Sequence, residues 1–225
     1  MNYPVIEFRD GMNITYEEAN ILFDNIVKFK PTTVLEMGRY TGLSTVYICK
    51  ALEEVERETT FFSLDFKSSE NDRAEKMLSK NKIDNVLLEN FDDYKELKER
   101  AKKIAKEAEF VYIDACHGDI HDLWKAIETS LPKICIAIFH DALCEETETM
   151  KVGSLIKKIS KKYATETIET SDSAGNLNGF CMVFVEKKSK AKPKKENIYI
   201  EEKKQVEVVD SNKSTTTIVD DTEKK

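Results

Sequence analysis

The chain has 225 residues, of which 40% are hydrophobic, and this is enough for one domain with a sizeable core. Its net charge of −7 and its pI near 5.3 argue against a surface built as a whole to bind nucleic acid. Its five cysteines are scattered without a CxxC pair, which favours free thiols in a reducing compartment over a disulfide framework. The sequence shows neither a signal-peptide pattern nor an apolar run of membrane length, so we expect a cytoplasmic protein without a membrane span.

Helical and strand patterns alternate along the chain. Helical spacing of apolar residues predicts helices over 15–29, 43–56, 70–81, 93–108, 123–131 and 152–163. Short apolar or alternating runs predict strands over 32–37, 59–65, 85–89, 109–114, 133–141, 165–171 and 179–187. This alternation predicts a doubly wound α/β fold, with a mostly parallel seven-stranded sheet between two helix layers. The last two strands have no helix between them, so we expect them to pair as an antiparallel hairpin.

The composition changes near the end of the last predicted strand. Residues 188–225 contain no Leu, Phe, Met or Trp and are dense in Lys, Glu, Ser and Thr. Such a segment cannot bury enough apolar surface to offset the entropy lost on ordering. The sequence therefore predicts one domain over residues 1–187, followed by a mostly disordered tail over 188–225.

The first strand ends in the turn "LEMGRYTGLST". Glu36 stands at the end of the strand, Gly38 and Gly42 lie in the turn, and Ser44 opens the next helix. Ligands of open parallel sheets bind at the carboxyl ends of the strands, so these residues are candidates for a binding site. Tyr40 stands where a dinucleotide-binding fingerprint needs its second glycine, and no GK[ST] phosphate loop follows. An acid with glycines favours a ligand that has a cationic amino acid part, although an ordinary strand-to-helix turn stays open.

The next two strands also end in carboxylates. Asp65 follows the second strand and could accept hydrogen bonds from the two hydroxyls of a ribose, or could cap a helix. Asp92 follows the third strand and could accept a hydrogen bond from an adenine amino group. Alternatively, Asp92 or Asp93 could cap the next helix.

All three histidines lie within a short part of the chain, at positions 117, 121 and 140. A zinc site built from Cys116, His117 and His121 is one explanation, because the two histidines have the i, i+4 spacing of one helix face. That explanation is disfavoured, since no second Cys/His pair completes a closed four-ligand site.

Five segments in this order resemble the class I S-adenosylmethionine-dependent methyltransferases, and in particular the branch of small O-methyltransferases. The segments are "VLEMGRYTGLST", Asp65, "FVYIDACH", "IAIFHDA" and "NGFCMVFVEK". The resemblance implies that the turn after the first strand holds the methionine part of the cofactor and that Asp65 holds its ribose. The candidate cofactor-binding residues are Glu36, Gly38, Gly42, Ser44, Asp65, Asp92 and Asp114. The chain lacks the Gly-Gly usual before strand five and an aromatic residue usual after His117, and this leaves the acceptor open.

The resemblance also implies a reaction. Strands four and five are neighbours in that fold, so Asp114, His117, His140 and Asp141 should gather at one place. We expect transfer of a methyl group from S-adenosylmethionine to a hydroxyl oxygen of a small molecule or sugar. Asp114, His140 and Asp141 would hold a divalent cation, Mg²⁺ or one that tolerates imidazole, such as Mn²⁺, Fe²⁺ or Zn²⁺. His117 would take the proton of the acceptor, and Asp114 would assist it.

Two other classes of function stay open at this stage. A nicotinamide-dependent oxidoreductase is disfavoured by the broken glycine fingerprint and by the terminal hairpin. A non-catalytic binding module or partner subunit is the other alternative, although polar residues stand at the ends of the strands. The sequence does not decide whether the chain forms a homo-oligomer, and it gives no clear sign of nucleic acid binding.

Overall fold

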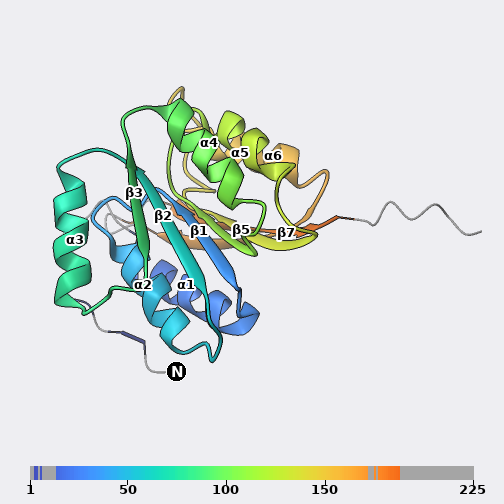
Figure 1. The fold of residues 1–225 in the computed structure, drawn as a ribbon. Coiled ribbons are helices and arrows are strands. Elements are labelled where there is room, and N and C mark those ends of the chain that lie inside the picture. The colour runs from blue at the N-terminus through green and yellow to red at the C-terminus, as the bar shows by residue number, and fades with distance from the viewer. Residues whose placement is uncertain (1–2, 5, 7–13, 172–174, 176, 188–225) are drawn as a thin grey trace, which may run out of the picture. The chain divides into compact units, whose positions relative to one another are not determined.

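The computed structural model describes residues 3–4, 6, 14–171, 175 and 177–187, and it shows one sheet covered by helices on both faces (Figure 1). The helices are α1 (Tyr16–Phe29), α2 (Leu43–Glu53), α3 (Glu70–Lys80), α4 (Tyr94–Ile104), α5 (Ile120–Glu128) and α6 (Val152–Ile159). The strands are β1 (Thr33–Met37), β2 (Thr60–Phe66), β3 (Leu87–Phe91), β4 (Phe110–Ile113), β5 (Ile134–Phe139), β6 (Ala164–Ser171) and β7 (Leu177–Glu186). The predictions for 188–225 lie outside the described residues.

The sheet has the strand order β3-β2-β1-β4-β5-β7-β6. Strands β1 to β5 pair in parallel, whereas β7 pairs antiparallel with both β5 and β6. The predicted fold, including the terminal hairpin, is therefore confirmed. The largest errors in an element's limits concern the ends of α4 and α6, which were predicted at residues 108 and 163 and lie at Ile104 and Ile159. The fifth helix, predicted over 123–131, begins at Ile120 instead.

Two hydrophobic cores lie on the two faces of the sheet. Helices α4, α5 and α6 cover one face, and α1, α2 and α3 lie on the other side (Figure 1). Trp124 of α5 is buried in the first core, where its ring meets Phe139 of β5 edge to face at 5.3 Å between centroids. Both faces of the central strands are buried, which explains why β4 consists of aliphatic and aromatic side chains, whereas β1 combines three apolar residues with the buried Thr33 and Glu36.

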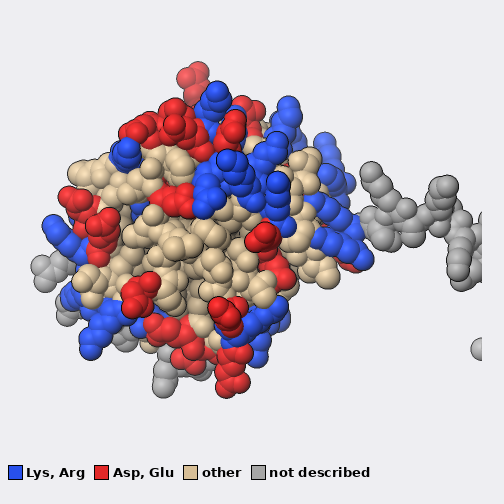
Figure 2. Space-filling view, viewed as in Figure 1, with Lys and Arg blue, Asp and Glu red and all other residues tan. Residues whose placement is uncertain are grey.

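The surface carries charges of both signs. In the view of Figure 2, acidic and basic side chains are mixed, and Lys and Arg side chains gather where α5 and α6 lie. Within the described residues, no helix combines the length and the apolar character that crossing a membrane requires.

The register of the parallel strands sets the position of the site. Met37, the last residue of β1, pairs with Leu64 of β2 and with Ile113 of β4. Ile113 in turn pairs with Phe139 of β5. The residues that follow these paired positions therefore lie side by side at one edge of the sheet, and they are Gly38, Asp65, Asp114 and His140.

Candidate active site

The turn after β1 needs glycine because the backbone of another strand lies against it. Gly38 has a φ of +87°, and a Cβ atom added there would lie 2.2 Å from the carbonyl oxygen of Asp114. Gly42 has a φ of +90° and caps α2, and a Cβ there would come within 3.1 Å of Ala74. The structural reason for Gly38 is thus the close approach of β1 to the end of β4, rather than room for a ligand alone.

Glu36 lies beneath this turn and is fully buried. Its carboxyl group accepts hydrogen bonds from the hydroxyls of Ser44 (2.6 Å), Thr45 (2.7 Å) and Ser63 (2.6 Å). Burial raises the pKa of Glu36 to about 7, although the three hydroxyl donors favour its charged form. Two of the residues predicted to bind the cofactor, Glu36 and Ser44, are therefore bonded to each other.

Asp65 also supports the turn. Its Oδ2 accepts hydrogen bonds from the backbone N–H groups of Arg39 (3.1 Å) and Tyr40 (2.9 Å), and its Oδ1 accepts one from Phe66 N–H (2.7 Å). The alternative role of Asp65 as a helix cap is excluded, since α3 begins after Ser69. Tyr40 has a φ of +49°, a backbone conformation that the two Asp65 contacts help to hold.

Asp92 lies further out than the other predicted residues. Its side chain is 71% exposed and forms an ion pair with Lys67 at 2.6 Å. The neighbouring Asp93 caps α4, because its Oδ1 accepts a hydrogen bond from Glu96 N–H at 2.9 Å. Of the two helix-capping alternatives, the structure therefore assigns Asp93 to the cap and leaves Asp92 without that role.

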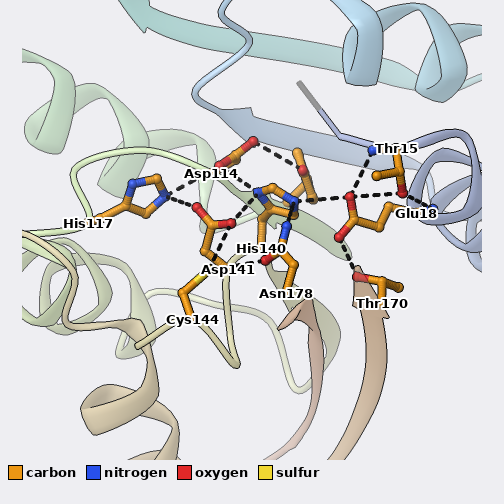
Figure 3. A network of polar contacts seen from close by, with 10 residues as sticks. Thr15, Glu18, Asp114, His117, His140, Asp141, Cys144, Thr170 and Asn178 are labelled. Atoms are coloured by element: carbon orange, nitrogen blue, oxygen red, sulfur yellow. Dashed lines mark hydrogen bonds and ion pairs between the residues drawn. The ribbon is translucent and has the colours of Figure 1, made fainter. Parts of the chain in front are cut away.

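Two aspartates and two histidines meet at the ends of β4 and β5 (Figure 3). His140 Nδ1 lies 3.0 Å from Asp114 Oδ1 and 3.3 Å from Asp141 Oδ1. His117 Nε2 lies 3.3 Å from Asp114 Oδ1 and 3.4 Å from Asp141 Oδ2. The two imidazoles thus flank the two carboxylates, as the strand order required.

The charges in this cluster shift one another's pKa values. Burial opposes ionisation of Asp114, but His140 and His117 outweigh it and hold the pKa of Asp114 well below its usual range. Burial opposes protonation of His140, yet Asp114, Glu18 and Asp141 raise its pKa well above the ordinary value. The pKa of His117 is also raised against burial, by Asp114 and Asp141. The imidazoles therefore compensate the carboxylates.

The donor atoms of the cluster suit a metal ion. Asp114, His140 and Asp141 can each offer a ligand atom such that these atoms lie within 4.8 Å of one another. His117 Nε2 is buried and, among the described residues, has no partner of good hydrogen-bond geometry. Two carboxylates and an imidazole form a mixed oxygen and nitrogen donor set, which divalent first-row metals accept.

Glu18 belongs to the same network and was not expected there. Its spacing from Thr15 predicts a capping box at the start of α1, and the structure contains that capping box. In addition, Glu18 is fully buried, and its Oε2 lies 3.3 Å from His140 Nε2. Thr170 of β6 and Asn178 of β7 complete this side of the network (Figure 3). Nothing in the sequence near Glu18 points to these partners, because His140 lies 122 residues away.

The third histidine stands apart from this cluster. His121 Nε2 lies 2.8 Å from Ser154 Oγ of α6, and its Nδ1 lies 3.4 Å from Lys158 Nζ. Among the described residues, the group of side chains placed to share a metal ion is Asp114, His140 and Asp141, and it includes neither Cys116 nor His121. The zinc site of Cys116, His117 and His121 is therefore not supported.

The strand order with an antiparallel β7 defines the class I methyltransferase architecture, and the polar edge described above lies where such folds bind their ligands. Residues 35–142 match the family model described as "Methyltransferase domain". Over residues 35–142 the chain is thus similar to methyltransferase domains, and it has the fold of solved O-methyltransferases. The comparison with curated proteins gave no match.

Solved structures with this fold include three relevant neighbours. The O-methyltransferase TomG of Streptomyces achromogenes, solved with S-adenosylmethionine, is 13% identical with a TM-score of 0.66, over 78% of this chain and 82% of its own. An O-methyltransferase of Bacillus cereus, solved with S-adenosylhomocysteine, is 14% identical with a TM-score of 0.66, over 77% and 83%. A methyltransferase of Podospora anserina, also bound to S-adenosylhomocysteine, is 11% identical with a TM-score of 0.61, over 78% and 80%. At these identities the likeness shows the fold.

Proposed function

We propose that this protein transfers a methyl group from S-adenosylmethionine to a hydroxyl oxygen of a small molecule or sugar. The observation that carries the proposal is the cluster of Asp114, His117, His140 and Asp141, at the edge of the sheet where the glycine turn also lies. A methyl transfer to oxygen needs an acceptor oxygen held in line with the sulfonium and a group that takes its proton. The cluster offers both kinds of group.

The cofactor would occupy the edge formed by β1, β2 and β4. The turn from Glu36 to Gly42 would hold its methionine part, with Ser44 bracing Glu36 from α2. Asp65 would accept the ribose hydroxyls and Asp92 the adenine amino group, while the backbone of Asp114 would line the centre. Two structural neighbours of this chain support the assignment. TomG was solved with S-adenosylmethionine, and the Bacillus cereus enzyme was solved with S-adenosylhomocysteine.

Asp114, His140 and Asp141 would hold a divalent cation, since their donor atoms fit one. Such a cation lowers the pKa of a bound acceptor hydroxyl and orients its oxygen. His117 would accept the proton, because its buried Nε2 faces the cluster without a hydrogen bond of good geometry. S-adenosylmethionine, when bound, would supply the methyl group to the deprotonated oxygen, and S-adenosylhomocysteine would be the leaving product.

Calorimetric titration of the full chain with S-adenosylmethionine tests the cofactor, and titration with NAD serves as the comparison. Binding of NAD in place of S-adenosylmethionine by the folded protein would show the proposal to be wrong. Transfer of a labelled methyl group to a panel of phenols, catechols and sugars tests the acceptor class. Activity is expected to disappear in excess EDTA and to return when a divalent salt is added.

The His117→Ala variant tests the proton acceptor. Turnover is expected to fall by about 10²–10⁴-fold, with cofactor affinity unchanged, because a positioned general base contributes on this scale. His121→Ala is the matched control, since His121 contacts Ser154 and Lys158 rather than the cluster. Unchanged turnover of His117→Ala would remove this assignment while leaving the metal assignment intact.

We also propose that residues 1–187 form the whole functional unit. The composition of 188–225 supports this, because that segment contains no Leu, Phe, Met or Trp and is dense in Lys, Glu, Ser and Thr. A chain truncated after Lys188 should keep its melting temperature and its cofactor affinity. A large drop in melting temperature would show that the segment contributes to the fold.

A further inference from the structure

Glu18 is buried in a way that its role in a capping box does not require. A glutamate at this position of a capping box usually lies in the exposed first turn of a helix. Here the side chain has no exposed surface, and each carboxylate oxygen has partners from distant parts of the chain. Oε1 accepts a hydrogen bond from Thr170 Oγ1 at 2.6 Å, while Oε2 accepts one from Thr15 N–H at 2.8 Å and faces His140 Nε2 at 3.3 Å.

His140 therefore has two different sides. Its Nδ1 faces the oxygens of Asp114 and Asp141, and its Nε2 faces Glu18. A carboxylate can only accept hydrogen bonds, so the imidazole must present a proton to Glu18 from Nε2. The side-chain nitrogen of Asn178 also lies 3.3 Å from Nε2, where it would meet the proton on that atom. If the amide is rotated by a half turn, its oxygen accepts a hydrogen bond from Nε2–H and its NH₂ group faces Cys144 Sγ.

A proton fixed on Nε2 leaves Nδ1 as the nitrogen that can bind a metal. Carboxylate groups orient metal-binding histidines in this way in many proteins, and their loss typically weakens metal binding by about 10–100-fold. Mg²⁺ and Ca²⁺ prefer oxygen ligands, whereas Mn²⁺, Fe²⁺, Co²⁺ and Zn²⁺ also accept imidazole. The orientation of His140 thus bears on which metals the cluster can select.

We propose that Glu18 is a positioning residue that fixes His140 with Nδ1 toward Asp114 and Asp141, and that the site thereby selects an imidazole-accepting transition metal over Mg²⁺. This inference rests on the proposed metal role of the cluster. It adds to that role a residue on α1 and a class of metal. The capping box of α1 and the metal site then share one carboxylate, which couples the start of α1 to the ends of β4 and β5.

Binding of Mn²⁺ and of Mg²⁺ to the full chain, each measured by calorimetry with chelator-treated protein, tests the inference. The two ions have the same charge, so their affinity ratio reports the donor atoms rather than the electrostatics. The wild type is expected to bind Mn²⁺ at least about 10-fold more tightly than Mg²⁺. His140→Asp, which replaces the imidazole by oxygen donors, is expected to reduce this ratio by raising the affinity for Mg²⁺. An unchanged ratio in this variant overturns the inference.

Glu18→Gln should weaken Mn²⁺ binding about 10–100-fold in the wild-type background, but less than about 3-fold in the His140→Asp background. Thr170→Val is the matched control, because it removes the other buried partner of Glu18 without touching His140. It should lower the melting temperature and leave Mn²⁺ affinity unchanged. Equal losses of Mn²⁺ affinity in the two backgrounds, or an equal loss in Thr170→Val, would reduce Glu18 to a purely structural residue.

The calorimetry also separates the inference from the proposed function. If the folded wild type does not bind S-adenosylmethionine, the proposed function itself is contradicted. Binding of the cofactor together with a preference for Mg²⁺ would contradict only the inference about His140 and Glu18. If Glu18→Gln does not fold, the ratio of Mn²⁺ to Mg²⁺ affinity in His140→Asp decides whether the imidazole selects the metal, since that variant keeps Glu18 in place.

Discussion

The two halves of the candidate site compensate their carboxylates in different ways. At the ends of β1 and β2, Glu36 and Asp65 receive hydrogen bonds from hydroxyls and backbone N–H groups. At the ends of β4 and β5, Asp114 and Asp141 instead face two imidazoles. In the first half, the hydrogen-bond donors are groups that the fold itself puts in place. In the second half, carboxylates face imidazoles of opposite charge. These carboxylates could bind a metal ion in place of the imidazolium groups, and the imidazoles could then take up or release a proton.

The largest effect is expected where the two halves touch. Gly38→Ala places a methyl group 2.2 Å from the carbonyl oxygen of Asp114, so either β1 or β4 must move. We expect a loss of about 4 kcal/mol or more in the free energy of unfolding, measured by urea denaturation. Gly175→Ala is the control, because Gly175 also has a positive φ (+83°) but nothing within 4 Å of its added Cβ. It should cost only the backbone strain, about 1–2 kcal/mol. Equal losses in the two variants would contradict the close approach of the halves.

The sequence predicted much of this arrangement because the period of apolar residues separates strands from helices. The parallel order then forces Asp114 and His140 to the same edge, and that cluster could be predicted without coordinates. The contact that requires glycine at position 38 could not be predicted, since it depends on how closely β1 approaches the end of β4. Glu18 was also missed, because its local spacing from Thr15 already accounts for it as a capping residue. Local patterns do not reveal that one side chain serves two purposes.

Glu36→Gln tests the protonation of Glu36 in the first half. Between the ordinary pKa of 4.5 and the folded value of about 7, the folded state holds a proton that the unfolded state has lost. The wild type should therefore lose stability as pH rises through this window, with the stabilising contribution of the proton complete below it and absent above it. Relative to Glu36→Gln, we expect the wild type to lose about 2–3 kcal/mol between pH 5 and pH 8. Equal changes with pH in both proteins, measured by urea denaturation, would contradict this prediction.

Asp65→Ala and Asp92→Ala sharpen the boundary of the first half. Asp65 accepts hydrogen bonds from three backbone N–H groups, two of which lie in the turn, whereas Asp92 is exposed beside Lys67. Loss of Asp65 should weaken S-adenosylmethionine binding by about 1–3 kcal/mol, because it removes an acceptor and loosens the turn. Loss of Asp92 should reduce the free energy of S-adenosylmethionine binding by about 1 kcal/mol or less, since the contacts of a solvent-exposed carboxylate contribute little. Calorimetric titration of both variants with S-adenosylmethionine measures the two losses of affinity. A larger loss in Asp92→Ala than in Asp65→Ala would show that the adenine contact contributes more to binding than the ribose contact.

The smallest effect is expected for His121→Ala, and it marks the limit of the charged half. His121 lies in the first turn of α5, only four residues after His117, but its ring contacts Ser154 and Lys158 of α6. Loss of the contact with Ser154 should cost about 0.5–1.5 kcal/mol of stability, the usual net contribution of one hydrogen bond. Mn²⁺ affinity and turnover should stay within about 2-fold of the wild type, because the ring takes no part in compensating Asp114 or Asp141. A loss of metal affinity comparable to that of His140→Asp would extend the charged half onto α5 and restore a role for the third histidine in the site.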